Sequence, residues 1–333
     1  MLTGNDNAVS AQVACTVAAY VTNFQAPSLS VIDSTSMATT TIATTADPYR
    51  IAITSDGTKG FISNYFDDTV SVIDTATNTI TTTIAAGDGP VGITINPAGT
   101  LAYVALINTD NVATIDIATN TVTTTFSAGD SPTDIVFTPD GTWGYILNLN
   151  SNDVAYFPTS TNIVVGAAAV GSGPQGMAMS PDGTAVWVTN TNSNTISVIS
   201  TATNTVTGTF AMANAPRGLA FSESGTTAYV TQRTANQLAV VDVASRTIST
   251  TIPTGSAPIT VDLHPGGGSV YVTNIGDDSV SVISTSTNAV TSTVAVGLAP
   301  TSLAFRPCPP PPTPTTSTTT PGIDPELVPT FTG

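Results

Sequence analysis

Short runs in which apolar residues alternate with small polar ones recur along the whole chain, and turns rich in glycine, asparagine and aspartate separate them. In the stretch that begins at Pro174, such runs cover residues 176–180, 185–190, 196–199 and 206–210. A period of two residues is typical of half-buried β-strands, whereas an amphipathic helix shows a period of about 3.6, which the chain lacks. The pattern therefore predicts short antiparallel strands joined by tight turns.

These strands belong to a unit that repeats at a fixed interval. Seven prolines follow one another at intervals of 42 residues: Pro48, Pro90, Pro132, Pro174, Pro216, Pro258 and Pro300. Seven aromatic residues keep the same register, with a single interval of 41: Tyr20, Phe61, Tyr103, Tyr145, Trp187, Tyr229 and Tyr271. Four strands in each repeat of about 42 residues are the signature of a propeller blade. We therefore expect an all-β fold, a seven-bladed β-propeller with four antiparallel strands per blade.

The two ends of the chain should meet in one blade. The chain begins in the second strand of a unit, near Val17, and residues 300–305 form the first strand of one. The last blade is therefore expected to combine the C-terminal first strand with the N-terminal second to fourth strands, because ring closure removes exposed sheet edges. The sequence divides accordingly into an N-terminal arm (1–16), the propeller (17–307) and a Pro/Thr-rich stalk and tail (308–333).

Both cysteines fall at this junction. Cys15 and Cys308 map onto the repeat position of Asp182, in the turn between the first two strands, and this turn is cut in the last blade. We therefore predict a disulfide between Cys15 and Cys308, with two unrelated buried thiols as the alternative. A crosslink that closes nearly the whole chain would stabilise the fold by roughly 4–5 kcal/mol and would imply an oxidising compartment.

Composition narrows the classes of function. The chain of 333 residues carries 22 acidic and 6 basic side chains, a net charge of −16, yet only 8% of its residues are charged and 41% are hydrophobic. This hydrophobic content argues against a disordered polyanion. A single lysine, Lys59, and five scattered arginines argue against binding of nucleic acid, which takes clustered basic residues. No run of about 18 apolar residues occurs, so we expect no membrane span.

Three short motifs inside the unit resemble those of a known repeat family. They are Tyr-Val-Thr-Asn at 271–274, Asp-Asp-Ser-Val-Ser-Val-Ile at 277–283 and Pro-Asp-Gly-Thr at 181–184. Together they resemble the YVTN-family β-propeller repeat over about 290 residues, in all seven units. The resemblance implies relatives among prokaryotic cell-surface and surface-layer proteins. More distantly, it implies propellers that house lactonases, nitrous oxide reductase and haem d1 nitrite reductase, and the fold alone does not choose among them.

Histidine chemistry is scarce in this chain. His264 is the single histidine, which excludes multi-histidine copper sites, and the lack of a Cys-x-x-Cys-His motif excludes covalent haem attachment. We expect His264 to be an ordinary solvated or hydrogen-bonded residue at the end of a first strand. Two residues earlier, Asp262 replaces a small residue close to the axis, where it either lines a functional channel or forms hydrogen bonds locally or to channel water.

Side chains on one face of the propeller should surround the entrance of the central pore. The candidate residues for binding a small ligand or an acidic group of a partner are Tyr49, Arg50, Asp134, Arg217, Arg233 and Asp262. About ten loop aspartates share this face. Ca²⁺ on these loops is the only cofactor considered; no loop has the Asp-x-Asp-x-Asp-Gly spacing, and solvated turn aspartates are the alternative. The sequence assigns no catalytic residue and no metal ligand.

Two functions of different class follow. The first is an extracellular or cell-surface structural or interaction module on a Pro/Thr stalk, acting in adhesion or as a scaffold. Its partner would be a protein, a surface glycan or further copies of the chain, in the last case in a filament or layer. The alternative is a pore-centred, lactonase-like hydrolase or lyase that uses Asp134, Asp262 and the arginines. The scarcity of His, Glu and Lys on the pore face favours the first function.

Overall fold

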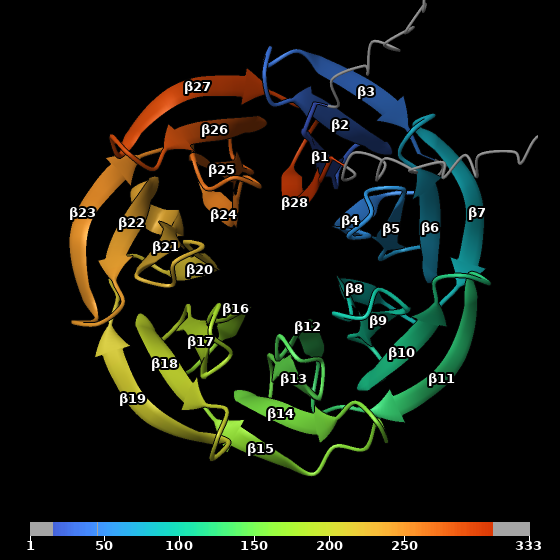
Figure 1. Ribbon diagram of the computed structural model, residues 1–333, viewed down its shortest axis with the longest axis horizontal. Coiled ribbons are helices and arrows are strands. Elements are labelled where there is room, and N and C mark those ends of the chain that lie inside the picture. Colours follow the sequence, from blue (N-terminus) through green and yellow to red (C-terminus); the bar gives the residue numbers. More distant parts are fainter. Residues whose placement is uncertain (1–15, 45, 309–333) are drawn as a thin grey trace, which may run out of the picture.

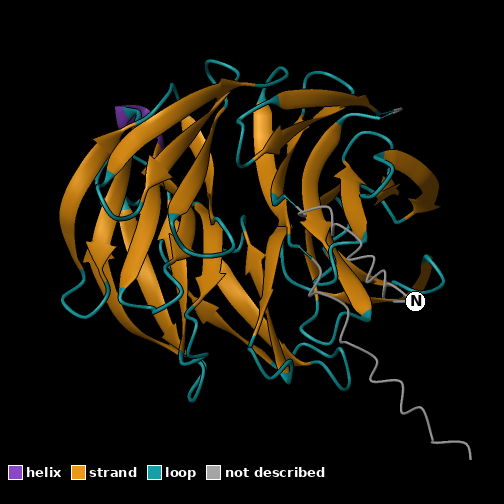
Figure 2. Cartoon of the chain, turned by 45° about the horizontal axis from the view of Figure 1, so that its top comes forward, coloured by secondary structure: helices purple, strands orange, loops and turns teal. Residues whose placement is uncertain are grey.

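The computed structural model describes residues 16–44 and 46–308. Its 28 strands form seven four-stranded antiparallel sheets, which stand as blades around a central axis (Figure 1). The predicted seven-bladed β-propeller is therefore confirmed. The strands run between two faces that carry the loops, where the described residues also form one short 3₁₀-helix, η1 (Arg233–Ala235) (Figure 2). No helix in this part of the chain is long and apolar enough to cross a membrane.

Each blade places its first strand beside the axis and its fourth at the periphery (Figure 1). The innermost strands of blades 1 to 7 are β4 (Pro48–Ile53), β8 (Pro90–Ile95), β12 (Pro132–Phe137), β16 (Pro174–Met179), β20 (Pro216–Phe221), β24 (Pro258–Leu263) and β28 (Pro300–Arg306). The second strands are β5 (Lys59–Asn64), β9 (Leu101–Leu106), β13 (Trp143–Asn148), β17 (Ala185–Asn190), β21 (Thr227–Gln232), β25 (Ser269–Asn274) and β1 (Ala18–Asn23). The third strands are β6 (Thr69–Asp74), β10 (Asn111–Asp116), β14 (Asp153–Pro158), β18 (Thr195–Ser200), β22 (Gln237–Asp242), β26 (Ser279–Ser284) and β2 (Ser28–Asp33). The outermost strands are β7 (Thr79–Ala85), β11 (Thr121–Ser127), β15 (Gly166–Ala169), β19 (Thr205–Ala211), β23 (Thr247–Pro253), β27 (Ala289–Ala295) and β3 (Thr39–Ala43).

Blade 7 joins the two ends of the propeller. β28 pairs antiparallel with β1, with Tyr20 opposite Ala304, and the sheet order β28–β1–β2–β3 is the closure that the repeat predicts. Cys15 lies outside the described residues, so its disulfide with Cys308 stays a prediction. The predicted stalk and tail, apart from Cys308 itself, also lies outside them, in residues 309–333.

The hydrophobic core lies between neighbouring blades, because each sheet packs both of its faces against the next sheets. One cluster joins Phe61 and Val72 of blade 1 to Ile93 and Val104 of blade 2. The second and third strands are therefore buried along most of their length, whereas the outermost strands expose threonines to solvent. This arrangement leaves hydroxyls rather than charges on the outer wall and explains the low charged fraction.

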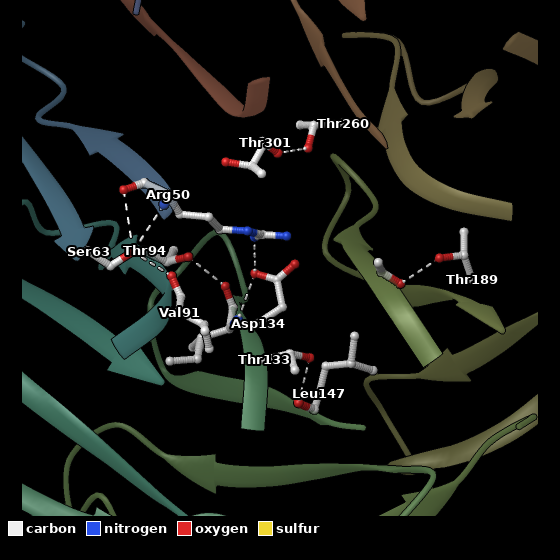
Figure 3. Close-up of polar contacts among 12 residues, drawn as sticks. Arg50, Ser63, Val91, Thr94, Thr133, Asp134, Leu147, Thr189, Thr260 and Thr301 are labelled. Atoms are coloured by element: carbon white, nitrogen blue, oxygen red, sulfur yellow. Dashed lines mark hydrogen bonds and ion pairs between the residues drawn. The ribbon is translucent and has the colours of Figure 1, made fainter. Parts of the chain in front are cut away.

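The threonine or serine of the repeated motif links neighbouring blades (Figure 3). In blade 1, Ser63 accepts a hydrogen bond from the N–H of Arg50 at 3.1 Å and donates to the carbonyl oxygen of Val91 in blade 2 at 2.7 Å. In blade 7, Thr22 donates in the same way to the carbonyl oxygen of Tyr49 at 3.0 Å. In these blades the hydroxyl fixes the innermost strand of the next blade and positions the first residue after its proline.

The tyrosine of the motif forms a second link between blades. Its hydroxyl donates to the Oδ1 atom of an asparagine in a turn of the next blade, from Tyr103 to Asn162 at 3.1 Å and from Tyr145 to Asn204 at 2.7 Å. The two asparagines have φ values of 53° and 54°. Asparagine tolerates this left-handed conformation, so the backbone and the hydrogen bond both favour asparagine in this turn.

Phe61→Tyr is expected to stabilise the propeller by about 1 kcal/mol. Phe61 is fully buried at the tyrosine position of blade 1, and within the described chain the buried Oδ1 atom of Asn120 in the next blade has no hydrogen-bond partner. A phenol at residue 61 would supply the missing donor. Urea unfolding of the wild-type protein and the variant measures the effect.

The control for this variant is Tyr103→Phe, which removes the donor from Asn162 and should destabilise by a similar amount. A Phe61→Tyr protein that is less stable than the wild type would show that the blade 1 interface has no room for the hydroxyl.

Candidate functional site

A cavity of about 520 Å³ opens along the central axis of the propeller. The innermost strands of all seven blades contribute to its wall, so the site belongs to the ring as a whole. Its volume suits a small organic molecule. The charged and hydroxyl-bearing side chains of the wall are Tyr49, Arg50, Thr94, Thr133, Asp134, Arg217, Thr260, Asp262, Thr301 and Ser302.

Glycines let neighbouring innermost strands approach closely around the cavity. The second residue after the proline is glycine in three blades: Gly92, Gly176 and Gly218. A Cβ atom on Gly92 would collide with the carbonyl oxygen of Thr133 in the next blade, and the other two glycines show the same contact with their neighbours. The innermost strands of these blades therefore pack backbone against backbone. Blades 1 and 3 carry Arg50 and Asp134 at this position instead.

Arg50 and Asp134 form an ion pair on the cavity wall. The Nη1 atom of Arg50 in β4 lies 2.8 Å from Oδ1 of Asp134 in β12, so the pair joins blade 1 to blade 3 (Figure 3). The same Oδ1 atom accepts the N–H of Ile135 at 3.0 Å. The two side chains are 26% and 9% exposed. Burial acts to lower the pKa of Arg50, but the attraction of Asp134 and Tyr49 and the hydrogen bond to Asp134 outweigh it, and the pKa is raised.

Among the described residues, Arg217 is a cation without an anionic partner. It is half-buried on the cavity wall, and the pair described above is the one ion pair within the described residues. Burial lowers the pKa of Arg217; Tyr49 opposes this shift, while the like charges of Arg233 and Arg50 reinforce it. A half-buried guanidinium that lacks a counter-ion favours the binding of an anionic ligand.

Asp262 is the second carboxyl group of the cavity. It lies on β24 at the fourth position after the proline, where other blades carry small residues, among them Ala52, Ala178, Ala220 and Ala304. Asp262 lines the cavity, yet the surrounding strands shield its carboxyl group from bulk water. This burial raises the pKa of Asp262 to about 7, against the weaker opposing effect of the N–H of Leu263, which donates to Oδ1 at 2.8 Å. No cation contributes to the shift, so Asp262 exchanges a proton near neutral pH.

The structure brings most of the predicted pore residues together. Five of the six line the one cavity: Tyr49, Arg50, Asp134, Arg217 and Asp262. The sixth, Arg233, is the first residue of η1 and acts on Arg217 from outside the cavity wall. His264 also lies off the wall, where its ring packs edge-to-face on Phe305 at a centroid distance of 5.3 Å and burial lowers its pKa. Sequence reasoning missed Gln175 on the wall, although it occupies the same repeat position as Tyr49 and Arg217.

Several of the loop aspartates have a structural role. Asp68, Asp110 and Asp278 adopt positive φ, and each accepts a backbone N–H from the residue that precedes the next proline. Asparagines make the same bond in three other blades: Asn152, Asn194 and Asn236. Because an amide replaces the carboxylate, the negative charge is not needed there. Within residues 16–44 and 46–308, no three His, Cys, Asp or Glu side chains are grouped so as to hold a metal ion.

Two family models match parts of the chain. A model of YNCE-like β-propellers matches residues 21–177, and a model of seven-bladed lactonase β-propellers matches residues 167–295. Each covers less than half of the chain, and between them they span most of the blades. The chain is thus a seven-bladed propeller similar to both families. Neither model describes a surface-layer protein, so the resemblance to that type stays a prediction.

Solved structures share the fold at low sequence identity. A functionally unknown protein from Desulfotomaculum acetoxidans DSM 771 is 18% identical with a TM-score of 0.76, covering 88% of this chain and 99% of that one. A candidate 6-phosphogluconolactonase from Bacteroides fragilis NCTC 9343 is 17% identical with a TM-score of 0.74 and the same coverage of 88% and 99%. Kuenenia stuttgartiensis hydrazine synthase is 20% identical with a TM-score of 0.72, covering 77% and 88%. No curated protein sequence matches the chain.

Proposed function

We propose that the central cavity is the active site of a hydrolase that opens small anionic lactones. The observation that carries this proposal is that one cavity is lined by both Asp262, a carboxyl group with a pKa of about 7, and Arg217, a cation without an anionic partner among the described residues. A carboxyl group poised near neutral pH is suited to general acid–base catalysis. The unpaired guanidinium supplies the binding site for a carboxylate or phosphate on the substrate.

The reaction follows from these two groups. The Asp262 carboxylate takes a proton from a water molecule as the water oxygen forms a bond to the lactone carbonyl carbon. The ring C–O bond then breaks, and the proton passes from Asp262 to the leaving alkoxide, which yields a hydroxy acid and restores the carboxylate. Arg217 follows its proline directly, three residues before the level of Asp262, so a strand rise of about 3.3 Å per residue offsets the two backbone positions by about 10 Å along the strand direction. Such a separation suits a substrate whose anionic group lies away from its lactone ring.

The comparisons support this function over a purely structural one. The matched lactonase model covers blades that contribute Arg217 and Asp262, and a structural neighbour from Bacteroides fragilis carries the description of a candidate 6-phosphogluconolactonase. The activity named in that description acts on a phosphorylated sugar lactone, which has the anionic character that Arg217 would recognise. The proposal therefore selects the alternative that sequence reasoning ranked second.

Hydrolysis of glucono-δ-lactone 6-phosphate and of glucono-δ-lactone tests the proposal. We expect acceleration above the spontaneous rate, with kcat/KM about tenfold or more higher for the phosphorylated lactone, since pairing with a desolvated arginine contributes about 1.5–3 kcal/mol. Arg217→Met should remove this preference by raising KM for the phosphorylated compound. A pH indicator follows the acid that is released.

The matched control is Arg246→Met, which removes an arginine that is not on the wall of the central cavity. Failure of the wild-type protein to accelerate either lactone, or any other member of a panel of small carboxylated lactones, would overturn the proposal.

The role as an extracellular or cell-surface module stays a second prediction. Its support is the hydroxyl-rich outer wall formed by strands such as β7 and β11, whose threonines are largely exposed. The stalk that would carry the propeller lies outside the described residues. Immunogold labelling of intact cells of the source organism tests this location, and label confined to broken cells would argue against it.

A further inference from the structure

Four aromatic side chains form a continuous cluster that reaches the mouth of the cavity through one of them, Tyr49. Phe24 comes from the β1–β2 loop, Tyr49 from the start of β4, and Tyr65 and Phe66 from the β5–β6 loop. Ring centroids lie 5.3 Å apart for Phe24 and Tyr49, 5.6 Å for Phe24 and Phe66, 4.9 Å for Tyr65 and Phe66, and 6.2 Å for Tyr49 and Tyr65. We call these four residues the aromatic platform.

The platform offers an open ring surface. Phe66 is 66% exposed, the largest value among the large hydrophobic residues that the structure describes. Its ring stacks on that of Phe24 with an interplanar angle of 24°, so the two rings present nearly parallel faces. Such surfaces attract the flat faces of other rings.

Comparison among the blades shows that the fold does not need an aromatic ring at Phe66. The positions equivalent to Phe66 hold Asn108, Asn150 and Asn192 in blades 2 to 4. Asn108 donates to a carboxylate oxygen of Asp88 at 2.7 Å, so this position normally helps to fix the loops. Phe66 gives up that bond and exposes apolar surface, which in soluble proteins marks a binding site more often than a structural feature.

The platform is continuous with the cationic part of the cavity. Tyr49 belongs to both, because it lines the cavity and contacts Phe24 and Tyr65. Tyr49 also forms a side-chain hydrogen bond with Arg217, and the charged neighbours Arg233 and Arg50 are cations. An apolar ring surface and an unpaired cation therefore meet at one mouth.

We infer that this mouth binds a small amphipathic anion, a carboxylate or phosphate attached to an aryl group, with the anion at Arg217 and the aryl ring on Phe24 and Phe66. The inference deepens the proposed function and rests on it for the role of Arg217, but it concerns binding and not turnover. A ligand of this class satisfies the cation and covers the exposed rings together, which neither a plain sugar acid nor a neutral aromatic compound does.

Ligand-observed NMR titration with 3-phenylpropionate and propionate tests the inference, because the two acids differ only in the phenyl ring. The wild-type protein should bind 3-phenylpropionate about tenfold more tightly than propionate. Phe66→Asn introduces the residue that three other blades carry, so folding should be unaffected. It should weaken binding of 3-phenylpropionate about fivefold and leave binding of propionate unchanged.

Ile163→Asn is the matched control, since Ile163 is 62% exposed and lies in blade 3 away from the platform; it should change neither affinity. Equal affinity for the two acids, insensitivity to Phe66→Asn, or equal binding of neutral 3-phenylpropanol would overturn the inference.

A protein that discriminates between the two acids yet hydrolyses no lactone would count against the proposed function alone. Lactone hydrolysis without this discrimination would count against the aromatic platform alone.

Discussion

Asp262→Asn is expected to lower kcat for lactone hydrolysis at least about 100-fold, because it removes the proposed general base. The substitution is nearly isosteric, and the amide still accepts the N–H of Leu263. Binding of the anionic group at Arg217 should persist, so KM should change little. In the wild-type protein kcat/KM should rise with pH and reach half of its maximum near pH 7, where Asp262 loses its proton.

The same substitution should make the folded protein more stable above pH 7. Burial raises the pKa of Asp262 to about 7, well above its value in an unfolded chain, so the folded state holds the proton more tightly. Between about pH 4 and pH 7 the folded state binds more protons than the unfolded state, and the free energy of unfolding contributed by this group falls as the pH rises. The loss is complete above pH 7 and amounts to about 4 kcal/mol at most. Asp262→Asn removes the buried carboxylate, so the variant does not lose this stability as the pH rises.

Urea unfolding at several pH values from 4 to 8, with both proteins, measures this effect. Asp278→Asn is the matched control, because asparagine fills the equivalent loop position in three other blades and the change removes one charge outside the cavity. Its free energy of unfolding should stay within about 0.5 kcal/mol of the wild-type value. An Asp262→Asn protein that retains full activity would show that the carboxyl group does not act as the base. An Asp262→Asn protein that is destabilised equally at pH 5 and pH 8 would show that the carboxyl group does not carry the burial cost.

The architecture was predictable from the sequence because every repeat position has a fixed structural role. The prolines at intervals of 42 residues begin the innermost strands, and the closure of blade 7 by β28 and β1 follows from the frame of the repeat. The hydrogen bonds that explain the repeated motif residues appear only in the structure. Ser63 bridges two innermost strands, and Tyr103 reaches the turn asparagine of the next blade. Such hydrogen bonds join residues that are far apart in sequence.

The candidate site was predictable only where it departs from the repeat. Asp262 was found because it replaces a small residue, and Arg50 and Arg217 because they follow the prolines. Their different states were not predictable: Arg50 forms an ion pair with Asp134, two blades away, whereas Arg217 has no anionic partner among the described residues. The scarcity of histidine and glutamate led sequence reasoning to favour a structural module. In the proposed function, one cavity aspartate with a pKa of about 7 supplies the acid–base group without them.

Arg50→Met and Arg217→Met are expected to change stability in opposite directions. Both replace a cavity arginine with an unbranched apolar side chain. Arg50→Met leaves the carboxylate of Asp134, only 9% exposed, without its cation. Breaking a buried pair costs about 3–5 kcal/mol, and the 26% exposure of Arg50 reduces the expected loss to about 2–3 kcal/mol. Arg217→Met removes a half-buried charge that has no anionic partner and should stabilise by about 0.5–1 kcal/mol.

A double-mutant cycle with Asp134→Ala isolates the pair. Asp134→Ala alone should destabilise by about 2–3 kcal/mol, because it leaves the guanidinium of Arg50 unpaired. Arg50→Met combined with Asp134→Ala should lose less than the sum of the single losses, by about 1.5–3 kcal/mol. The cycle of Arg217→Met with Asp134→Ala should show a much smaller coupling, since no ion pair joins these residues. Additive losses for Arg50 and Asp134 would mean that the ion pair contributes nothing to stability, and that Arg50 is as available to an anionic ligand as Arg217.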